Sequence, residues 1–277
     1  MIKKITLPLR RRIVITLGLC ALLFVLVFAK GLTMPPSAWD VDFNAINQPP
    51  SWKHFFGTDW LGRDMFSRTV KGLTTSIVIG LIASLISAAL AVVLGIAAAS
   101  LGRKVDAFVN GMVNVFLSVP HLILLVLIAI ACGKGLQGVL IGVAATHWTS
   151  LARIIRAEVL ALKNARYISC AQAFGKSNLW IAGVHFLPHI IPQCIIGVVL
   201  LFPHSILHES SVTFLGFGLS PEQPAIGVIL SESMRYLSAG LWHLAVFPGL
   251  SLLIIVMLFD IAGEQLRLIL NPGTAHL

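Results

Sequence analysis

The chain has 277 residues, of which 57% are hydrophobic and 11% are charged, and its mean hydropathy is +0.92. Soluble domains carry about 25% charged residues, so this composition excludes an ordinary soluble enzyme and predicts a protein whose solvent is lipid. The net charge of +9 is spread between apolar blocks rather than gathered in one patch. This spread favours helix orientation in a membrane and excludes nucleic acid as a partner.

Six apolar stretches are long enough to cross the hydrocarbon core as helices, which takes roughly 20 residues each. They cover residues 13–29, 76–100, 108–132, 136–155, 188–212 and 241–263. Pro120 interrupts the third stretch, and Pro192 and Pro203 interrupt the fifth, where a proline removes a backbone hydrogen bond and favours a kink. The sequence therefore predicts an all-α polytopic membrane protein with six transmembrane helices.

The first stretch follows a basic lead and ends without a small-residue cleavage site, so we expect a retained anchor. If the N-terminus is cytosolic, the inside segments hold thirteen of the Lys and Arg residues and the outside segments hold seven. This bias predicts that both termini are cytosolic. We expect an anchor span with an outside segment over 1–75, and a core transmembrane domain over 76–277.

Residues 169–180, SCAQAFGKSNLW, come close to a phosphate-binding loop. The Gly-Lys-Ser ending fits, but Cys170 stands where the first glycine is needed. Such a loop also follows a buried strand, whereas residues 157–174 have the composition of a helix. We therefore predict no nucleotide site but a short amphipathic helix, a break at Gly175 and a second helix up to Pro188, suited to docking on another protein.

The same segment resembles the cytosolic motif of inner-membrane permeases of ATP-binding-cassette importers. That motif reads Glu-Ala-Ala, three residues, Gly, nine residues, an apolar residue, any residue, Leu-Pro. Four positions match it: Ala171, Gly175, Leu187 and Pro188. Three depart from it: Ser169, Cys170 and His185. The resemblance implies a cytosolic coupling helix between the fourth and fifth spans, in a coupling segment over 157–187 that docks on an ATPase. The candidate coupling residues are Ser169, Ala171, Gly175, Lys176, Leu187 and Pro188.

Two further motifs resemble the dipeptide, oligopeptide and nickel permeases of these importers. Residues 57–68, GTDWLGRDMFSR, are similar to their GTDxLGRDxxSR element, and residues 211–219, SVTFLGFGL, are similar to their SxSFLGLG. Phe-Pro-Gly-Leu at 247–250 and Asn-Pro at 271–272 also match. The matches come in the right order along nearly the whole chain, which is identified as a member of this group.

The resemblance implies a transport subunit in the bacterial inner membrane that has no cofactor and forms half of a translocation pathway. Its expected partners are a second homologous permease chain, two ATP-binding-cassette ATPase subunits that hydrolyse the ATP, and a periplasmic or lipid-anchored solute-binding protein. An intramembrane enzyme is the alternative from another class. The sequence has neither paired carboxylates nor a His-Glu-x-x-His motif to support an enzyme.

The outside motif at 57–68 holds four charged residues that are candidates for contact at the periplasmic face: Asp59, Arg63, Asp64 and Arg68. On a helix, Asp64 and Arg68 lie four residues apart, so they can pair. We favour a self-paired structural element at the membrane surface. The alternative is a contact with the solute-binding protein.

Ionisable groups inside spans are costly and indicate function. The fifth span holds His204 and His208, whose imidazoles share one helix face and suit nickel, copper or zinc. The same span holds Glu209, which we expect to face the bundle interior and to pair with a polar group of the partner permease. The histidines nearer span ends are expected at the interface: His121, His185, His189 and His243.

Nickel-type permeases resemble this chain in a His-x-x-x-His before the Phe-Leu-Gly motif and in a His-Trp pair in the fourth span. The resemblance implies nickel or a nickel chelate as the solute, with a transient metal contact at His204 and His208. The candidate substrate path comprises His147, His204, His208 and Glu209. Two alternatives stay open: a dipeptide or oligopeptide solute, and histidines that only hydrogen-bond to carbonyls freed by Pro203.

Overall fold

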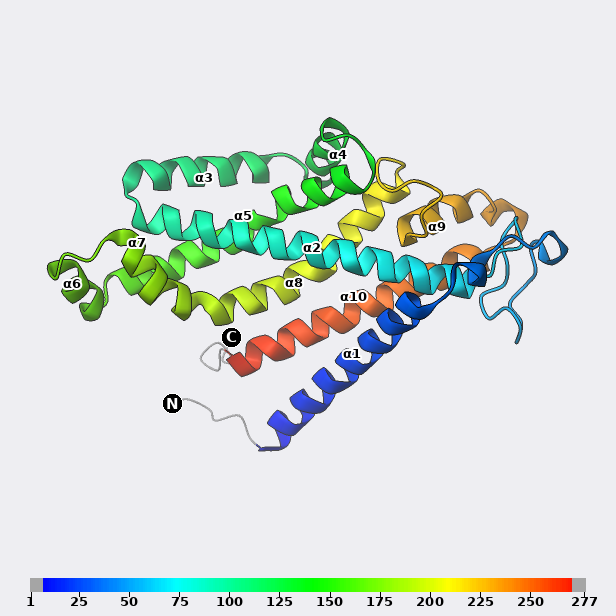
Figure 1. Ribbon diagram of the computed structural model, residues 1–277, viewed down its shortest axis with the longest axis horizontal. Coiled ribbons are helices and arrows are strands. Elements are labelled where there is room, and N and C mark those ends of the chain that lie inside the picture. Colours follow the sequence, from blue (N-terminus) through cyan, green and yellow to red (C-terminus); the bar gives the residue numbers. More distant parts are fainter. Residues whose placement is uncertain (1–6, 271–277) are drawn as a thin grey trace.

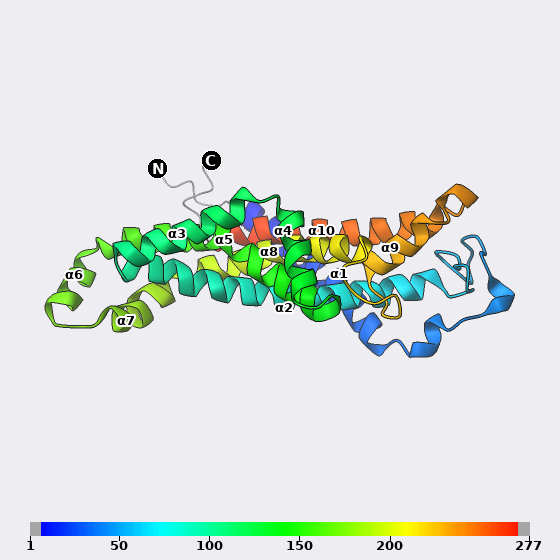
Figure 2. The same ribbon diagram turned by 90° about the horizontal axis from the view of Figure 1, so that it is seen from above.

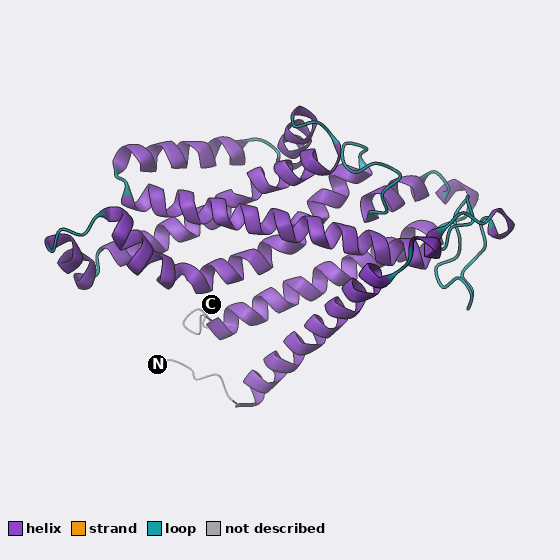
Figure 3. Cartoon of the chain, in the orientation of Figure 1, coloured by secondary structure: helices purple, strands orange, loops and turns teal. Residues whose placement is uncertain are grey.

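The computed structural model describes residues 7–270, and within that range the fold is helical with no β-strand (Figure 3). The long elements are α1 (Leu7–Thr33), α2 (Met65–Ser100), α3 (Arg103–Ser118), α4 (His121–Ala131), α5 (Gly135–Lys163), α8 (Leu187–Phe214) and α10 (His243–Leu270). The short elements are η1 (Pro36–Trp39), η2 (Phe43–Ala45), α6 (Arg166–Ala173), α7 (Asn178–Ile181), η3 (Ala182–Phe186), α9 (Ile226–Met234) and η4 (Leu237–Ala239). The Asn-Pro match at 271–272 lies outside the described residues.

Five helical stretches are long and apolar enough to cross a membrane, and a bent pair brings the number to six when it is taken as one span. The five are Arg11–Thr33, Met65–Ser100, Gly135–Lys163, Asn178–Phe214 and His243–Leu270. This arrangement confirms an all-α polytopic membrane protein.

The third predicted span is not one straight helix. The chain turns by 102° between α3 and α4, because Pro120 lacks an N–H and forces the residue before it out of the helical region. Val119 accordingly has φ −96° and ψ 136°. α4 has 11 residues, which is about 16 Å of helix and too short to cross a bilayer alone. Figure 2 shows α3 lying along the bundle and α4 turned across it.

The bundle is elongated, with its two ends carrying different elements. In Figure 1, α6 and α7 lie at one end, while α9 and the connection between α1 and α2 lie at the other. The first described turn of α1 and the last of α10 both point toward the α6 end. This arrangement agrees with two termini on the side of the coupling segment.

The core forms where α2 packs along α5 and α8. Small residues allow the close approach: a Cβ on Gly95 would lie 2.9 Å from the carbonyl oxygen of Ala152 on α5. A Cβ on Gly138 would overlap the carbonyl oxygen of Ala129, so α4 also sits tightly on α5. Close packing through small residues is the usual way membrane helices associate. In α1 and α10 only 11% and 22% of the apolar stretch is buried within this chain, so both helices keep exposed apolar side chains for lipid or another chain.

Two element boundaries differ from the sequence-based expectation. α2 begins at Met65, so residues 65–75 are the first turns of a helix and not part of an outside loop. The helix starts there because the Asp64 carboxylate accepts the Ser67 N–H at 2.8 Å as an N-cap. α5 continues to Lys163, so residues 157–163 extend a membrane helix instead of opening the coupling helix.

Candidate functional site

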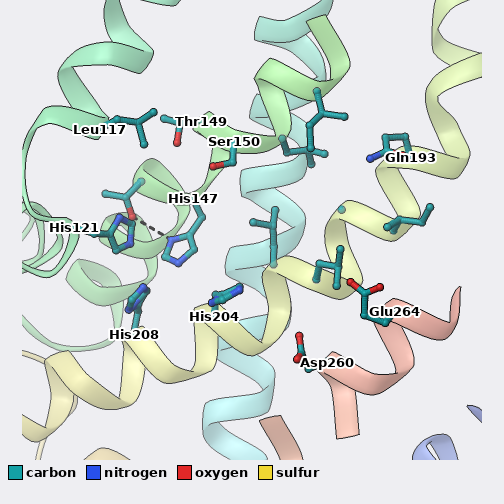
Figure 4. A pocket seen from close by; sticks show the side chains of 17 residues that line it. Leu117, His121, His147, Thr149, Ser150, Gln193, His204, His208, Asp260 and Glu264 are labelled. Carbon is teal, nitrogen blue, oxygen red and sulfur yellow. Dashed lines mark hydrogen bonds between the residues drawn. The ribbon is translucent and has the colours of Figure 1, made fainter. Parts of the chain in front are cut away.

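A cavity of about 480 Å³ opens between α4, α5, α8 and α10. Figure 4 shows imidazoles from α4, α5 and α8 gathered on one wall and carboxylates from α10 on the other. The imidazoles belong to His121, His147, His204 and His208. The cavity therefore places ionisable groups from four helices around one space at the depth of the membrane spans.

Three of the four imidazoles form a compact group. The ring centroids of His121 and His147 are 4.7 Å apart, those of His121 and His208 are 4.5 Å apart, and those of His147 and His208 are 5.0 Å apart. One ring nitrogen of each lies within 4.8 Å of one from each of the others. The bend at Pro120 creates the group, because it starts α4 at His121 beside α5.

His147 is held in one tautomer by its own helix. Its Nδ1 lies 2.8 Å from the carbonyl oxygen of Val143, to which it donates, and 3.1 Å from the hydroxyl of Thr146. The Nε2 of His147 therefore carries the lone pair. That atom is buried and has no hydrogen-bond partner among the described residues, and the same holds for Nε2 of His121.

The sequence-based metal pair differs from this group. His204 lines the cavity but is exposed and lies outside the compact group, which joins His208 to His121 and His147. His121, which the sequence placed at a span end, lies beside His147 and His208 on the cavity wall, because α4 begins directly after Pro120. A histidine directly after Pro120, inside an apolar stretch, was the signal in the sequence.

Two acidic residues of this cavity were not predicted from the sequence. Asp260 and Glu264 lie one helical turn apart on α10 and line the cavity opposite the imidazoles (Figure 4). Glu264 is 3.5 Å from Arg267, and Asp260 makes no ion pair with any other described residue. Asp260 falls inside the sixth predicted span, so the rule that intramembrane charges indicate function could have found it.

Glu209 points away from this cavity into the protein. It is fully buried and accepts hydrogen bonds from Ser210 at 3.2 Å and Thr213 at 3.0 Å. The expected pairing with the partner permease is thus replaced by hydroxyls of the same helix. A hydroxyl one turn along a helix is well placed to satisfy a buried carboxyl group.

The outside motif forms an ion network that reaches another part of the chain. One carboxylate oxygen of Asp59 lies 2.7 Å from Nε of Arg63 and 2.7 Å from a guanidinium nitrogen of Arg68. Arg68 also contacts Glu232 of α9 at 2.8 Å. Asp59 and Arg68 are 0% and 3% exposed. This network ties the start of α2 to α9 at the end of the bundle opposite α6.

Asp64 does not pair with Arg68. Besides capping α2, its carboxylate lies 3.0 Å from Nδ1 of His54. At the N-cap position the Asp64 side chain folds over the first turn of α2. Arg68, one turn into the helix, is instead directed to Asp59 and Glu232.

The coupling segment has the predicted helix, break and helix. After α6, Gly175 adopts φ +75°, and Ser177 caps α7 by accepting the Trp180 N–H at 3.2 Å. α7 then runs through a π-helical turn, η3, into α8. Pro188 accounts for this turn, since it cannot donate the hydrogen bond that a regular α-helix needs. The side chains of Phe174 and Leu179 are 84% and 77% exposed.

Comparisons with known proteins agree with this architecture. Residues 91–276 match the family described as binding-protein-dependent transport system inner membrane component. The chain is 31% identical to the dipeptide transport system permease protein DppC of Bacillus subtilis (strain 168), over 92% of this chain and 80% of that protein. It is 33% identical to a putative peptide transport system permease protein of Brucella suis, over 95% and 89%. It is 29% identical to the glutathione transport system permease protein GsiD of Pectobacterium atrosepticum, over 95% and 88%.

The fold is similar to a chain in structures of inward-facing conformations of the MetNI methionine ABC transporter. The TM-score is 0.60 at 17% identity, over 75% of this chain and 98% of that chain. A second crystal form gives a TM-score of 0.58. Together with the family match over two thirds of the sequence, these findings mean that the chain belongs to the binding-protein-dependent transport system inner membrane components and is a permease subunit of an ABC importer, not an enzyme.

Proposed function

We propose that the chain forms half of the translocation pathway for short peptides in an importer of the bacterial inner membrane. The cavity between α5, α8 and α10 carries this proposal, because it sets carboxylates against imidazoles across one space. A short peptide is a zwitterion. Its ammonium group suits Asp260 and Glu264, and its carboxylate can accept from the exposed imidazole of His204. The peptide-transport relatives, aligned over nearly the whole chain, support the same solute class.

The contacts along the path are weak, because a solute that passes through must also leave. Half of the pathway comes from this chain, and the exposed apolar faces of α1, α2 and α10 leave room for a second homologous permease chain. A periplasmic or lipid-anchored solute-binding protein delivers the solute at the outer end. The ion network of the outside motif serves mainly to hold that end together.

Two ATPase subunits drive the cycle through the coupling segment. Phe174 and Leu179 present exposed apolar side chains on the two sides of the turn at Gly175, at the tip proposed to be cytosolic, where an ATPase groove can bury both. Ser169, Lys176 and the turn at Gly175 lie in the same tip. ATP binding moves this tip, and the helices continuous with it, α5 and α8, carry the movement to the cavity.

Nickel, as the ion or as a chelate, is the second candidate solute. One observation favours it: three imidazoles converge on the cavity wall, and imidazole suits nickel, copper and zinc. The His-x-x-x-His pattern at His204 and His208 adds to this reading.

Uptake by cells that express the whole system decides between the two solutes. We expect accumulation of a labelled dipeptide that unlabelled dipeptide suppresses and that excess nickel leaves unchanged. Accumulation of nickel-63 that is insensitive to dipeptide, without any dipeptide uptake, would overturn the peptide proposal in favour of nickel. Cells that express this chain without the two ATPase subunits serve as the control for transport through this importer.

A further inference from the structure

We infer that His121, His147 and His208 form an open binding site for one divalent transition-metal ion of the nickel, copper and zinc class. The inference goes beyond peptide transport and does not depend on it, because it concerns metal binding by this chain whatever solute passes. It differs from the pair predicted from sequence, since His204 is not a ligand and His121 is.

The distances fit a site that closes with small side-chain rotations. The nearest nitrogens lie within 4.8 Å of one another. Two imidazole nitrogens at about 2.1 Å from a tetrahedral ion stand about 3.4 Å apart. The gap is of the order of 1 Å, and the rings already face one another from three helices (Figure 4).

His147 is prepared as a ligand. A metal-bound histidine normally donates its other ring N–H to a carbonyl or carboxylate, which fixes the tautomer and aims the free nitrogen. Nδ1 of His147 donates to Val143 in this way. Its Nε2 is left buried without a hydrogen bond, and an orphaned buried acceptor is costly unless something binds it. Nε2 of His121 is likewise buried without a hydrogen-bond partner among the described residues.

The ligand set selects the class of ion. Three neutral nitrogen ligands without a carboxylate suit late first-row metals, whereas magnesium and calcium prefer oxygen. Three protein ligands also leave a coordination position open toward the cavity for water or for a donor atom of a solute. Asp260 and Glu264 on the far wall offset the charge of the ion.

The three ligands belong to α4, α5 and α8, so the site exists only while these helices stay together. Any rearrangement that separates them lowers the affinity, and the bound ion in turn favours the conformation seen here. Metal binding is thereby coupled to the transport cycle.

Equilibrium binding of nickel-63 to the purified importer complex tests the site, with cobalt absorption as the readout of coordination. We expect one ion per copy of this chain, undisplaced by excess magnesium, and a loss of affinity of about tenfold or more in His147→Gln and in His208→Gln. His204→Gln should keep the affinity, because His204 is not one of the three proposed ligands. This variant therefore distinguishes the three-histidine site from the pair predicted from sequence. His189→Gln, an exposed histidine elsewhere on α8, is the matched control.

Equal binding by wild type and His147→Gln overturns the inference, as does a loss in His204→Gln as large as in His208→Gln. Size-exclusion chromatography of the same variants shows whether the complex is intact, and dipeptide uptake is measured with the wild-type system. Dipeptide uptake without metal binding defeats the metal site and leaves the peptide proposal standing. Metal binding without dipeptide uptake supports the metal site and defeats the peptide proposal.

Discussion

Asp59 shows how much of the outer end depends on one buried carboxylate. It is 0% exposed and accepts from two arginine side chains and from the backbone N–H groups of Leu61 and Arg63. A buried ion pair contributes little when intact, because desolvation offsets the attraction, but removing one partner leaves an uncompensated charge.

Asp59→Asn should therefore destabilise the permease by up to about 3–5 kcal/mol, since it keeps the shape but leaves the buried guanidinium of Arg68 with Glu232 as its one remaining counter-charge among the described residues. Thermal unfolding of the purified complex measures the effect as a lowered midpoint. Asp40→Asn changes an exposed carboxylate in the same outside segment and should leave the midpoint unchanged. A midpoint for Asp59→Asn equal to that of Asp40→Asn would show that the network carries no stability.

Single residues were the hardest features to predict from sequence. The i,i+4 spacing correctly placed His204 and His208 on one helix, yet which imidazole meets another depends on where α4 starts. Glu209 was expected to face inward, and it does, but its partners are hydroxyls of its own helix. Asp260 was overlooked because one acidic residue barely alters the hydropathy of a long apolar stretch.

At the scale of elements, the prediction was sound for the long helices and weaker at their ends. A long apolar stretch is a reliable sign of a membrane helix, because few other structures satisfy the backbone hydrogen bonds of a chain in lipid. It does not mark the helical ends that reach beyond the lipid, such as residues 65–75 and 157–163. A proline in mid-span was interpreted as a kink in one helix, whereas Pro120 produces two helices at 102°.

The turn at Gly175 offers a test of coupling at this scale. Its φ of +75° suits glycine, and no atom within 4 Å would meet a Cβ there, so only the backbone conformation opposes a side chain. A β-branched residue in this left-handed region costs about 1–2 kcal/mol, which disfavours the turn by a factor of about 5 to 30. Gly175→Val should lower uptake and solute-stimulated ATPase activity accordingly, with normal membrane insertion.

Two variants show whether conformation is the cause. Gly175→Asn should retain most uptake, because asparagine tolerates the left-handed region better than valine. Gly111→Val, which adds the same side chain in open space on α3, should behave as wild type. If Gly175→Val transports normally, the turn has no part in coupling to the ATPases.

The whole molecule has one end rich in aromatic and charged side chains and an opposite end that carries the coupling segment, and we expect the first to be periplasmic and the second cytosolic. The placement of Lys and Arg along the chain predicts this polarity, since their bias toward the cytosol orients membrane helices. Partner surfaces could not be predicted in the same way, because lipid and protein cover an apolar helix face equally well.

Labelling with a membrane-impermeant maleimide tests the orientation. In a chain with Cys132→Ser and Cys170→Ser, Lys104→Cys lies exposed near the α2–α3 turn and should react only in inverted vesicles. Trp52→Cys, at a side chain that is 93% exposed in the outside segment, should react only in spheroplasts. The opposite pattern would reverse the membrane sidedness assigned here.

The tie between Arg68, Asp59 and Glu232 gives the molecule a fixed fulcrum. α2 has 36 residues, so it extends about 54 Å from that tie to its inner tip. A swing of about 10° around the fulcrum carries the tip through about 9 Å while the outer end stays in place. On the proposed coupling to the ATPases, we expect a push beside α6 to displace the inner tip of α2 by this amount, and loss of the ion pairs to let the other end of α2 move as well.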